Sequence, residues 1–323
     1  MKQNFINQQA IVGGLMVIMF LIFAFNSPTF IHQDNLVTLM QNVSILGILS
    51  LGMGMIVIGR GIDLSMISAL VVPPGLLMAL VQGGYSIGAA LLVALALAIA
   101  FGALNGWLIA YAEVSALFTT LASGLFLAGF GQAYLFQLET VQWPNALDRF
   151  SVLGRGTLLH LPLSIWIFGA VAVLVGAYLK YFRYGRFVYA MGDNPASAHA
   201  SGIPVRIIIV VQYVCSALIA AFAGAVLAAS LGGMPTRIYN STLIYDVILV
   251  VVLGGIGLAG GRGGISNILV GTLFIGIMLN GLTILDVSYS VQNLIRGFVL
   301  LAAIMIDSFL NPRNEETAQQ GDI

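Results

Sequence analysis

Ten long apolar stretches, separated by short polar segments, make up most of the chain. Each is close to the roughly 20 residues that a helix needs to cross the hydrocarbon core of a bilayer. They cover residues 10–25, 41–58, 64–82, 86–110, 115–136, 163–181, 207–230, 242–258, 265–284 and 291–309. The pattern predicts an all-α polytopic membrane protein of about ten transmembrane helices with short loops, forming a single domain over residues 1–323.

The first apolar stretch is interpreted as a spanning helix. It lacks a small-x-small cleavage site before Asn26-Ser27-Pro28, the feature that marks a removed signal peptide. We therefore expect residues 10–25 to remain in the protein, preceded by a short segment at residues 1–9.

Positive charges are distributed unevenly between the two sides of the predicted helices. If residues 1–9 lie in the cytoplasm and the helices alternate, most cations fall on the cytoplasmic side, and Arg296 falls within the last helix. The inside set is Lys2, Arg60, Lys180, Arg183, Arg186, Arg206, Arg262 and Arg313, and the outside set is Arg149, Arg155 and Arg237. This asymmetry is typical of the positive-inside rule, so we expect both termini, including the polar tail 311–323, in the cytoplasm.

The composition of the chain excludes several other classes of protein. The chain is 59% hydrophobic and 7% charged with a net charge of zero, which excludes a soluble globule and argues against a nucleic-acid-binding surface. Cys215 stands alone in an apolar run, and His32, His160 and His199 are far apart. Internal disulfides and metal sites are therefore not expected.

The longest predicted cytoplasmic loop, residues 182–206, carries the signals of a short helix. Asn194 suits the N-cap and Pro195 suits the first helical position. Gly202 suits a left-handed residue at the end of the helix, and Pro204 prevents its continuation. The residues alone leave two interpretations open: an ordered loop, or a helix that docks on a partner protein.

Two glycines and two opposite charges interrupt the apolar pattern at residues 59–65. In one interpretation, Asp63 caps the following helix and Arg60 offsets its charge. In the other, the segment is a moving break at membrane depth, where irregular backbone is tolerated only inside protein or along a cavity. The residues support both interpretations.

A second break is predicted at residues 253–264, where seven of twelve residues are glycine. Such a segment does not form a stable helix, and no Gly-Lys-Ser/Thr follows it to make a phosphate-binding loop. Asp246, in the preceding apolar stretch, is expected to cap a helix or line a cavity. The predicted backbone breaks, which we interpret as gating positions, are Gly61, Asp63, Gly254, Gly255, Gly260 and Gly261.

Three sequence blocks together resemble the membrane permease of ribose-type ABC sugar importers, a binding-protein-dependent transport permease. The first block is Ile62-Asp63-Leu64-Ser65. The second comprises Gly185-Arg186, Tyr189-Ala190, Gly192, Asn194, Ala198, Ser201-Gly202-Ile203 and Val205. The third comprises Val252-Leu253-Gly254-Gly255, Leu258, Gly260-Gly261 and Gly263. The blocks have the order and spacing of the family, and the similarity extends from Ser27 to Asp307.

The resemblance implies a function and a set of partners. Two permease chains, identical or sister chains, would sit on a separate ATPase, and a periplasmic binding protein would deliver a pentose, a hexose, a related polyol or a signalling sugar. The chain would be a multi-pass protein of the bacterial inner membrane. It would not be an enzyme and would bind no cofactor, because ATP and Mg²⁺ belong to the ATPase.

The resemblance also favours docking as the role of the loop helix. Residues 194–202 would correspond to the coupling helix, the permease element that contacts the ATPase. The residues expected to make this contact are Asn194, Pro195, Ala198, Ser201 and Gly202.

Several positions depart from the family pattern. Arg60 replaces a usually small residue, and Met66-Ile67 replace a commoner Val-Gly. Pro73-Pro74 interrupt the next predicted helix, and the segment from Gly263 to Thr272 is longer than usual. These differences bear on the translocation path, and therefore on the substrate more than on the class of protein.

A sugar path requires neutral polar groups and aromatic faces. The candidates chosen by predicted membrane depth are Asn42, Asn105, Gln132, Tyr134 and Asn280. For each of them the alternative role is a hydrogen bond between helices.

Two other classes of function are considered against the same residues: an ion-coupled carrier and an intramembrane enzyme. An ion-coupled secondary carrier would use Asp63, Asp246 and Arg296 as coupling groups and would transport without ATP, but it gives the loop helix no purpose. An intramembrane enzyme needs a nucleophile–base pair or a metal set at membrane depth. No His, Cys or paired carboxylate is placed in the sequence to suggest one.

Overall fold

The computed structural model describes residues 8–136 and 138–310, and the predicted segments 1–7 and 311–323 lie outside them. Within the described part, each predicted apolar stretch corresponds to a helix. These helices are α1 (Gln8–Asn26), α2 (Gln33–Ile58), α3 (Met66–Gln82), α4 (Ile87–Ala110), α5 (Ala116–Phe130), α7 (Leu163–Tyr181), α10 (Val205–Leu231), α11 (Leu243–Leu253), α12 (Ile265–Ile284) and α13 (Tyr289–Leu310).

The lengths of these helices divide them into two groups. Seven of the described helices are long and apolar enough to cross a membrane, counting α5 together with the π-helical segment η2 (Gly131–Phe136) that extends it. Helices α3 (17 residues) and α11 (11 residues) are shorter apolar helices, and α13 is apolar over Tyr289–Met305. The all-α polytopic architecture is confirmed.

Two helix boundaries differ clearly from the prediction. Helix α2 begins at Gln33 instead of residue 41, and the first-turn residue Asn35 exchanges hydrogen bonds with Asn280 of α12. This contact gives the polar start of the helix a partner that the apolar pattern does not reveal. Helix α11 ends at Leu253 instead of residue 258, because the glycine-rich segment begins at Gly254.

The expectation that Pro73-Pro74 interrupt a helix is wrong, because α3 continues through both. A proline at position 74 leaves the carbonyl of Leu70 without its helical donor. Gly224 of α10 packs against that carbonyl so closely that a Cβ on Gly224 would lie 1.8 Å from Leu70 O. A neighbouring helix thus accommodates the freed backbone group, as membrane helices permit.

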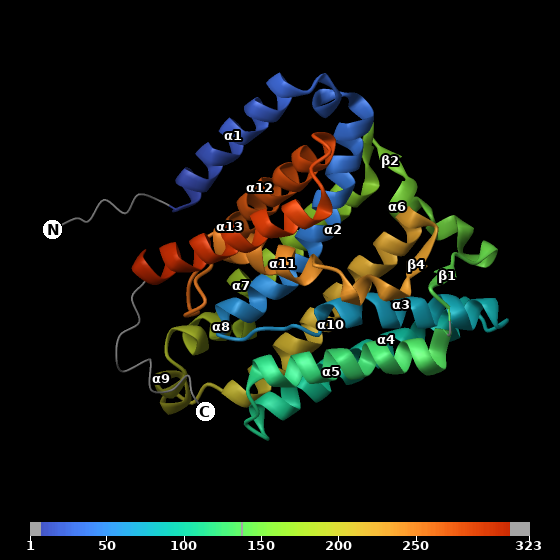
Figure 1. Cartoon of the computed structure of the whole chain (residues 1–323). Coiled ribbons are helices and arrows are strands. Elements are labelled where there is room, and N and C mark those ends of the chain that lie inside the picture. The colour runs from blue at the N-terminus through green and yellow to red at the C-terminus, as the bar shows by residue number, and fades with distance from the viewer. Residues whose placement is uncertain (1–7, 137, 311–323) are drawn as a thin grey trace.

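Helices α2 and α10 form the centre of the bundle (Figure 1). Helix α10 packs against α2, α3 and α4, and α2 also packs against α7, α11 and α12. Helix α1 lies on α12, and α13 lies on α11. The core cluster is concentrated on α2, where residues 43–58 are all buried.

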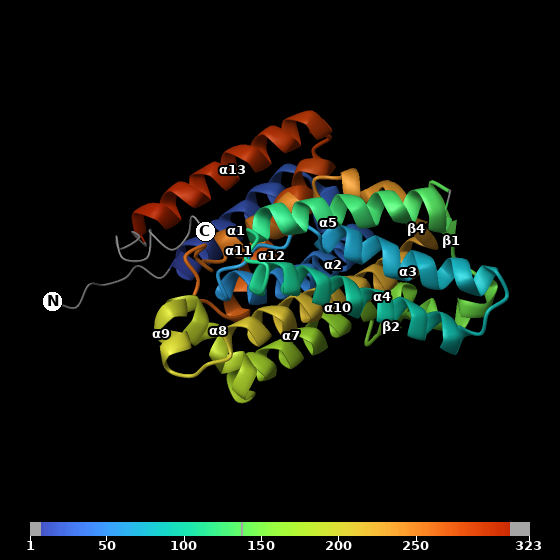
Figure 2. The ribbon, with the colours of Figure 1, turned by 90° about the horizontal axis from the view of Figure 1, so that it is seen from below.

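The two ends of the bundle differ in structure. One end carries two short antiparallel strand pairs, β1 (Thr140–Gln142) with β4 (Gly233–Pro235) and β2 (Thr157–Leu158) with β3 (Leu161–Pro162). The same end holds the short helices η3 (Asn145–Phe150), α6 (Val152–Arg155) and η4 (Thr236–Asn240). Helices α8 (Arg183–Asp193) and α9 (Pro195–Ala200) lie at the opposite end (Figures 1 and 2). The remaining short helix is η1 (Pro28–Ile31), between α1 and α2.

Candidate functional site

The predicted loop helix is present as α9, and its ends use the expected residues. The Asn194 side chain accepts a hydrogen bond from the Ser197 amide at 3.0 Å, and Pro195 occupies the first helical position. Gly202 has a φ of +76°, and its amide donates to His199 O at 2.9 Å. The predicted N-cap and the predicted left-handed glycine are both confirmed.

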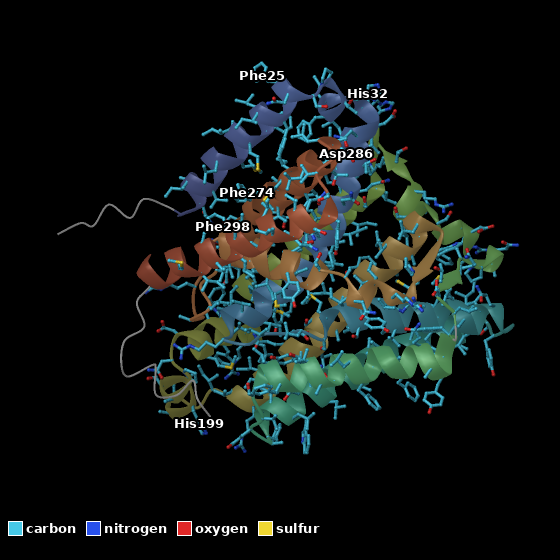
Figure 3. The ribbon with its side chains drawn as sticks, viewed as in Figure 1. Phe25, His32, His199, Phe274, Asp286 and Phe298 are labelled. Carbon is cyan, nitrogen blue, oxygen red and sulfur yellow. The ribbon has the colours of Figure 1, made fainter. Side chains whose placement is uncertain are left out.

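One of the five expected docking residues points inward. Ala198 is 4% exposed and belongs to the main core cluster, so its side chain faces the bundle. Ala196, His199, Ala200 and the end of the helix are exposed, and Figure 3 shows His199 at the outer edge of α9. The outer face of α9 therefore consists of small residues and one histidine.

Helix α8, which precedes α9, was not identified in the sequence. Its signal is an amphipathic pattern, in which Val188 and Met191 are buried while Arg183 and Arg186 are exposed. Gly185 permits close packing, because a Cβ there would lie 2.0 Å from Tyr178 O of α7. The glycine at position 185 thus fixes α8 tightly against the end of a long helix.

Arg60 joins three segments that are far apart in the chain. Its Nε donates to Gly192 O at 2.6 Å and to Ala259 O at 2.7 Å, and its Nη2 donates to Asp193 O at 2.7 Å. Gly192 and Asp193 end α8, where carbonyl groups lack helical partners and a cation is favourable. Arg60 therefore supplies the missing donors at the end of α8.

Close backbone packing accompanies these hydrogen bonds. The Gly261 amide donates to Ile58 O, at the end of α2, at 2.8 Å. A Cβ on Gly192 would lie 1.9 Å from Ile58 O and 2.6 Å from Gly261 N. We call this meeting of residues 58–61, 192–193 and 259–261 the Arg60 junction.

The predicted breaks at both glycine-containing segments are observed. Residues 59–65 separate α2 from α3, and residues 254–264 separate α11 from α12. Gly255, Gly260 and Gly261 have positive φ values of +91°, +79° and +72°, which explains why glycine is needed there. A gating role for these positions remains a prediction.

The proposed pairing of Arg60 with Asp63 is not observed. The Arg60 donors go to backbone carbonyls, as described above, whereas Asp63 is 2% exposed and accepts from hydroxyl groups. Its Oδ1 accepts from Ser65 N and Oγ at 3.0 and 2.5 Å, and its Oδ2 accepts from Ser216 Oγ at 2.7 Å. Ser65, not Asp63, is the N-cap residue of α3. Asp63 therefore ties the start of α3 to α10.

A hydrogen bond of Tyr189 links α8 to the glycine-rich segment 253–264 at a point outside the Arg60 junction. The Tyr189 hydroxyl donates to Gly263 O at 3.0 Å. Burial raises the pKa of Tyr189, so the hydroxyl stays protonated and remains a donor at physiological pH.

Replacement of this hydroxyl is expected to have a modest effect. Tyr189→Phe removes one hydrogen bond and should lower stability by about 1 kcal/mol, measured as a lower thermal midpoint of the purified protein. Tyr184→Phe on the same helix is the matched control, because the Tyr184 hydroxyl makes no hydrogen bond among the described residues. Equal midpoints for the two variants would contradict the assigned role of Tyr189.

The predicted substrate-path residues do not form one cluster through their hydrogen bonds. Asn105 donates to Ser65 Oγ at 2.9 Å, Gln132 accepts from Tyr239 at 2.8 Å, and Asn280 pairs with Asn35. These three side chains thus make contacts between segments. Asn42 and Tyr134 are exposed on the bundle surface.

The charged groups proposed for an ion-coupled carrier also have different partners. Asp63 is bound by serines, whereas Asp246 of α11 lies 3.2 Å from Arg296 of α13, between their Oδ1 and Nε atoms. Among the described residues, Asp246–Arg296 is the ion pair in which both side chains are mostly buried.

Comparison with known proteins identifies the class of molecule. The family model described as "branched-chain amino acid transport system / permease component" matches residues 35–304. The ribose import permease protein RbsC of Escherichia coli (strain K12) is 35% identical over 285 residues, covering 87% of this chain and 88% of that protein. The chain belongs to the ribose-type ABC permease family. The residues matched by the family model, 35–304, include all three segments of the Arg60 junction.

Two further relatives of the permease are named for other sugars. The xylose transport system permease protein XylH of Haemophilus influenzae is 29% identical and covers 86% of this chain and 90% of that protein. The L-arabinose transport system permease protein AraH of Escherichia coli is 34% identical over 64% of this chain and 61% of that protein. No solved structure matches the permease.

Proposed function

We propose that this chain is the membrane permease of an ATP-driven importer that moves a small sugar across the bacterial inner membrane. The names of the relatives, which include ribose, xylose and arabinose, support a pentose as the first substrate to test. Hexoses, related polyols and signalling sugars form the wider class. A periplasmic binding protein would deliver the sugar, and a second permease chain, identical or a sister, would complete the path.

The observation that carries this proposal is the Arg60 junction behind α8 and α9. Residues of α8 are hydrogen-bonded through Arg60 to both interruptions of the apolar helices. A movement of α9 would therefore be transmitted through the adjoining α8 and Arg60 to both breaks. This is the connection that an importer driven by a separate ATPase requires.

In the proposed mechanism the ATPase holds ATP and Mg²⁺, and the permease binds neither. The ATPase would dock on the exposed face of α9 at the cytoplasmic end, where both termini would also lie. Lys180, Arg183 and Arg186 are exposed next to this face, which favours an acidic rim on the partner groove. Closure of the ATPase dimer would move α8 and α9 and re-expose the central path on the other side.

The docking face is tested with charged substitutions at exposed alanines. Ala196→Glu should abolish co-purification with the ATPase, because it places a charge and extra volume on the outer face of α9. Ala146→Glu is the matched control, since Ala146 is an exposed alanine at the opposite end of the bundle. A substitution at Ala198 is unsuitable, because this buried side chain supports the fold. Normal ATPase binding by Ala196→Glu would refute the docking face.

The class of transport is tested by uptake into proteoliposomes that contain the permease, the ATPase and the binding protein. ATP enclosed in the proteoliposomes should drive uptake of ribose, xylose or arabinose in the absence of an ion gradient. Uptake driven by an ion gradient without ATP would refute the proposal and would favour the secondary carrier.

A further inference from the structure

A polar cluster lies between α11 and α13, outside the Arg60 junction. Its centre is the ion pair between Asp246 and Arg296, whose side chains are 7% and 11% exposed. Arg296 Nη1 also donates to Thr242 Oγ1 and, at 3.1 Å, to Asn293 Oδ1. The guanidinium lies over the Tyr289 ring, with 5.8 Å between its central carbon and the ring centroid.

The cluster lies near the start of both helices, in the first turn of α11 and about two turns into α13. Asp246 precedes the end of α11 at Leu253 by about 10 Å at 1.5 Å per residue. Arg296 follows the start of α13 at Tyr289 by a similar length. Figure 3 shows α13 running from the turn at Asp286 past Phe298 toward the end of the bundle where His199 lies. Arg296 therefore lies about two turns from the start of α13.

A buried ion pair contributes little net free energy to the packing of two membrane helices. Desolvation offsets much of the attraction, and apolar packing would join the helices at lower cost. Charged groups buried within a membrane protein therefore usually serve substrate or ion recognition. The hydrogen-bonding groups of this pair that have no partner also support a role in recognition.

The pair retains hydrogen-bonding capacity that no described residue uses. Asp246 Oδ1 and Arg296 Nε, 3.2 Å apart, are buried and make no hydrogen bond. Asp246 Oδ2 and Arg296 Nη2 also make none among the described residues, whereas Arg296 Nη1 donates to Thr242 and Asn293. The neighbouring Tyr289 is 58% exposed; Arg296 lies over one face of its ring, and its hydroxyl lies 3.2 Å from Thr242 Oγ1. A carboxylate and a guanidinium with unused hydrogen-bonding groups, next to an exposed aromatic ring, match adjacent sugar hydroxyls and an apolar sugar face.

We propose that Asp246, Arg296 and Tyr289 form a sugar-contacting site on the translocation path, in which neighbouring hydroxyl groups of the sugar bind Asp246 Oδ2 and Arg296 Nη2. This inference rests on the proposed function, since it assigns residues to the path of the importer. The proposed site includes none of the five path residues that were chosen by their predicted depth in the membrane. It also gives Tyr289 a role in stacking on the sugar ring.

The test compares ribose with 2-deoxyribose, which lacks one hydroxyl group. Uptake is measured in the proteoliposome assembly with a binding protein preloaded with each sugar. The same binding protein serves every variant, so a change in the ratio of the two uptake rates must come from the permease. A site that binds a hydroxyl through buried polar groups discriminates against the analogue that lacks it.

The main variant is the double substitution Asp246→Asn with Arg296→Gln, which avoids leaving a single buried charge. We expect the ribose preference to fall at least about tenfold, the equivalent of one lost hydrogen bond to a charged group. Tyr289→Ala is the second variant, because it removes the exposed ring while keeping both charges of the ion pair, and it should lower ribose uptake. Glu139→Gln with Arg237→Gln neutralises an exposed ion pair and is the matched control.

The outcomes separate this inference from the proposed function. Loss of discrimination in the double variant, with an unchanged control, supports the site. An unchanged ratio in the double variant together with wild-type ribose uptake by Tyr289→Ala, with normal ATPase co-purification, refutes it and leaves a structural ion pair. If the double variant does not assemble, Tyr289→Ala decides alone. Absence of ATP-driven uptake by the wild type refutes the proposed function itself.

Discussion

Gly192→Ala is expected to abolish sugar import and to destabilise the end of α8. The new Cβ would lie 1.9 Å from Ile58 O and 2.6 Å from Gly261 N, far inside contact distance. All the groups it meets are backbone, so no side-chain rotation relieves the overlap. Either the end of α8 moves or the hydrogen bond from Gly261 to Ile58 breaks, at a cost of about 1–3 kcal/mol or more. Thermal unfolding and ATP-driven uptake measure the two consequences.

Gly264→Ala is the matched control for this substitution. Gly264 lies in the same glycine-rich segment as Gly261, and a Cβ there meets nothing within 4 Å. Its uptake and thermal midpoint should stay close to those of the wild type. Equal behaviour of Gly192→Ala and Gly264→Ala would show that the backbone contact at Gly192 is not needed for transport.

Arg60→Gly is expected to uncouple transport while leaving the fold largely intact. The substitution removes three hydrogen bonds to Gly192, Asp193 and Ala259. It also relieves the backbone, because Arg60 has a φ of +66° that costs a non-glycine residue roughly 1 kcal/mol. Uptake should fall at least about tenfold, since each hydrogen bond to a charged group contributes about 1.5–3 kcal/mol.

Two further measurements make the Arg60 result specific. Hydrogen exchange at the end of α8 and at residues 257–261 should rise in Arg60→Gly, because the cation no longer holds these segments together. Arg60→Lys should recover only part of the uptake, because one ammonium cannot reproduce the fork of the guanidinium. Arg149→Gln, at an exposed arginine on the opposite end, should transport normally. Wild-type uptake by Arg60→Gly would show that the Arg60 junction does not transmit the motion.

Local sequence signals predicted the helices and the caps well. Apolar runs identified all the long helices, because each run is long enough to satisfy its own backbone hydrogen bonds in a bilayer. The α9 caps were predicted from Asn194, Pro195 and Gly202, since capping depends on residues within one helical turn. The error at Pro73-Pro74 has the opposite origin, because the helix there depends on Gly224 of another helix.

Functional residues were predictable from the sequence where the signal is local, and not where it depends on contacts between distant segments of the chain. The backbone breaks at Gly61 and Gly254 were identifiable, because glycine content alone argues against a helix. The orientation of Ala198 was not, because helices α8 and α9 pack as a pair on the bundle. The substrate candidates were chosen by depth alone, and the structure pairs Asn280 with Asn35 and Gln132 with Tyr239.

The sequence by itself determined the class of this protein, its apolar helices, its two glycine-rich breaks and the caps of α9. The helices, breaks and caps depend on residues within a few positions of one another, and the class follows from three blocks that can each be identified locally. Only the tertiary structure decided that Arg60 meets residues 132 and 199 positions away, and that Asp246 faces Arg296. Nothing in the sequence near Arg60 or Asp246 specifies those partners, because the packing of whole helices brings them together.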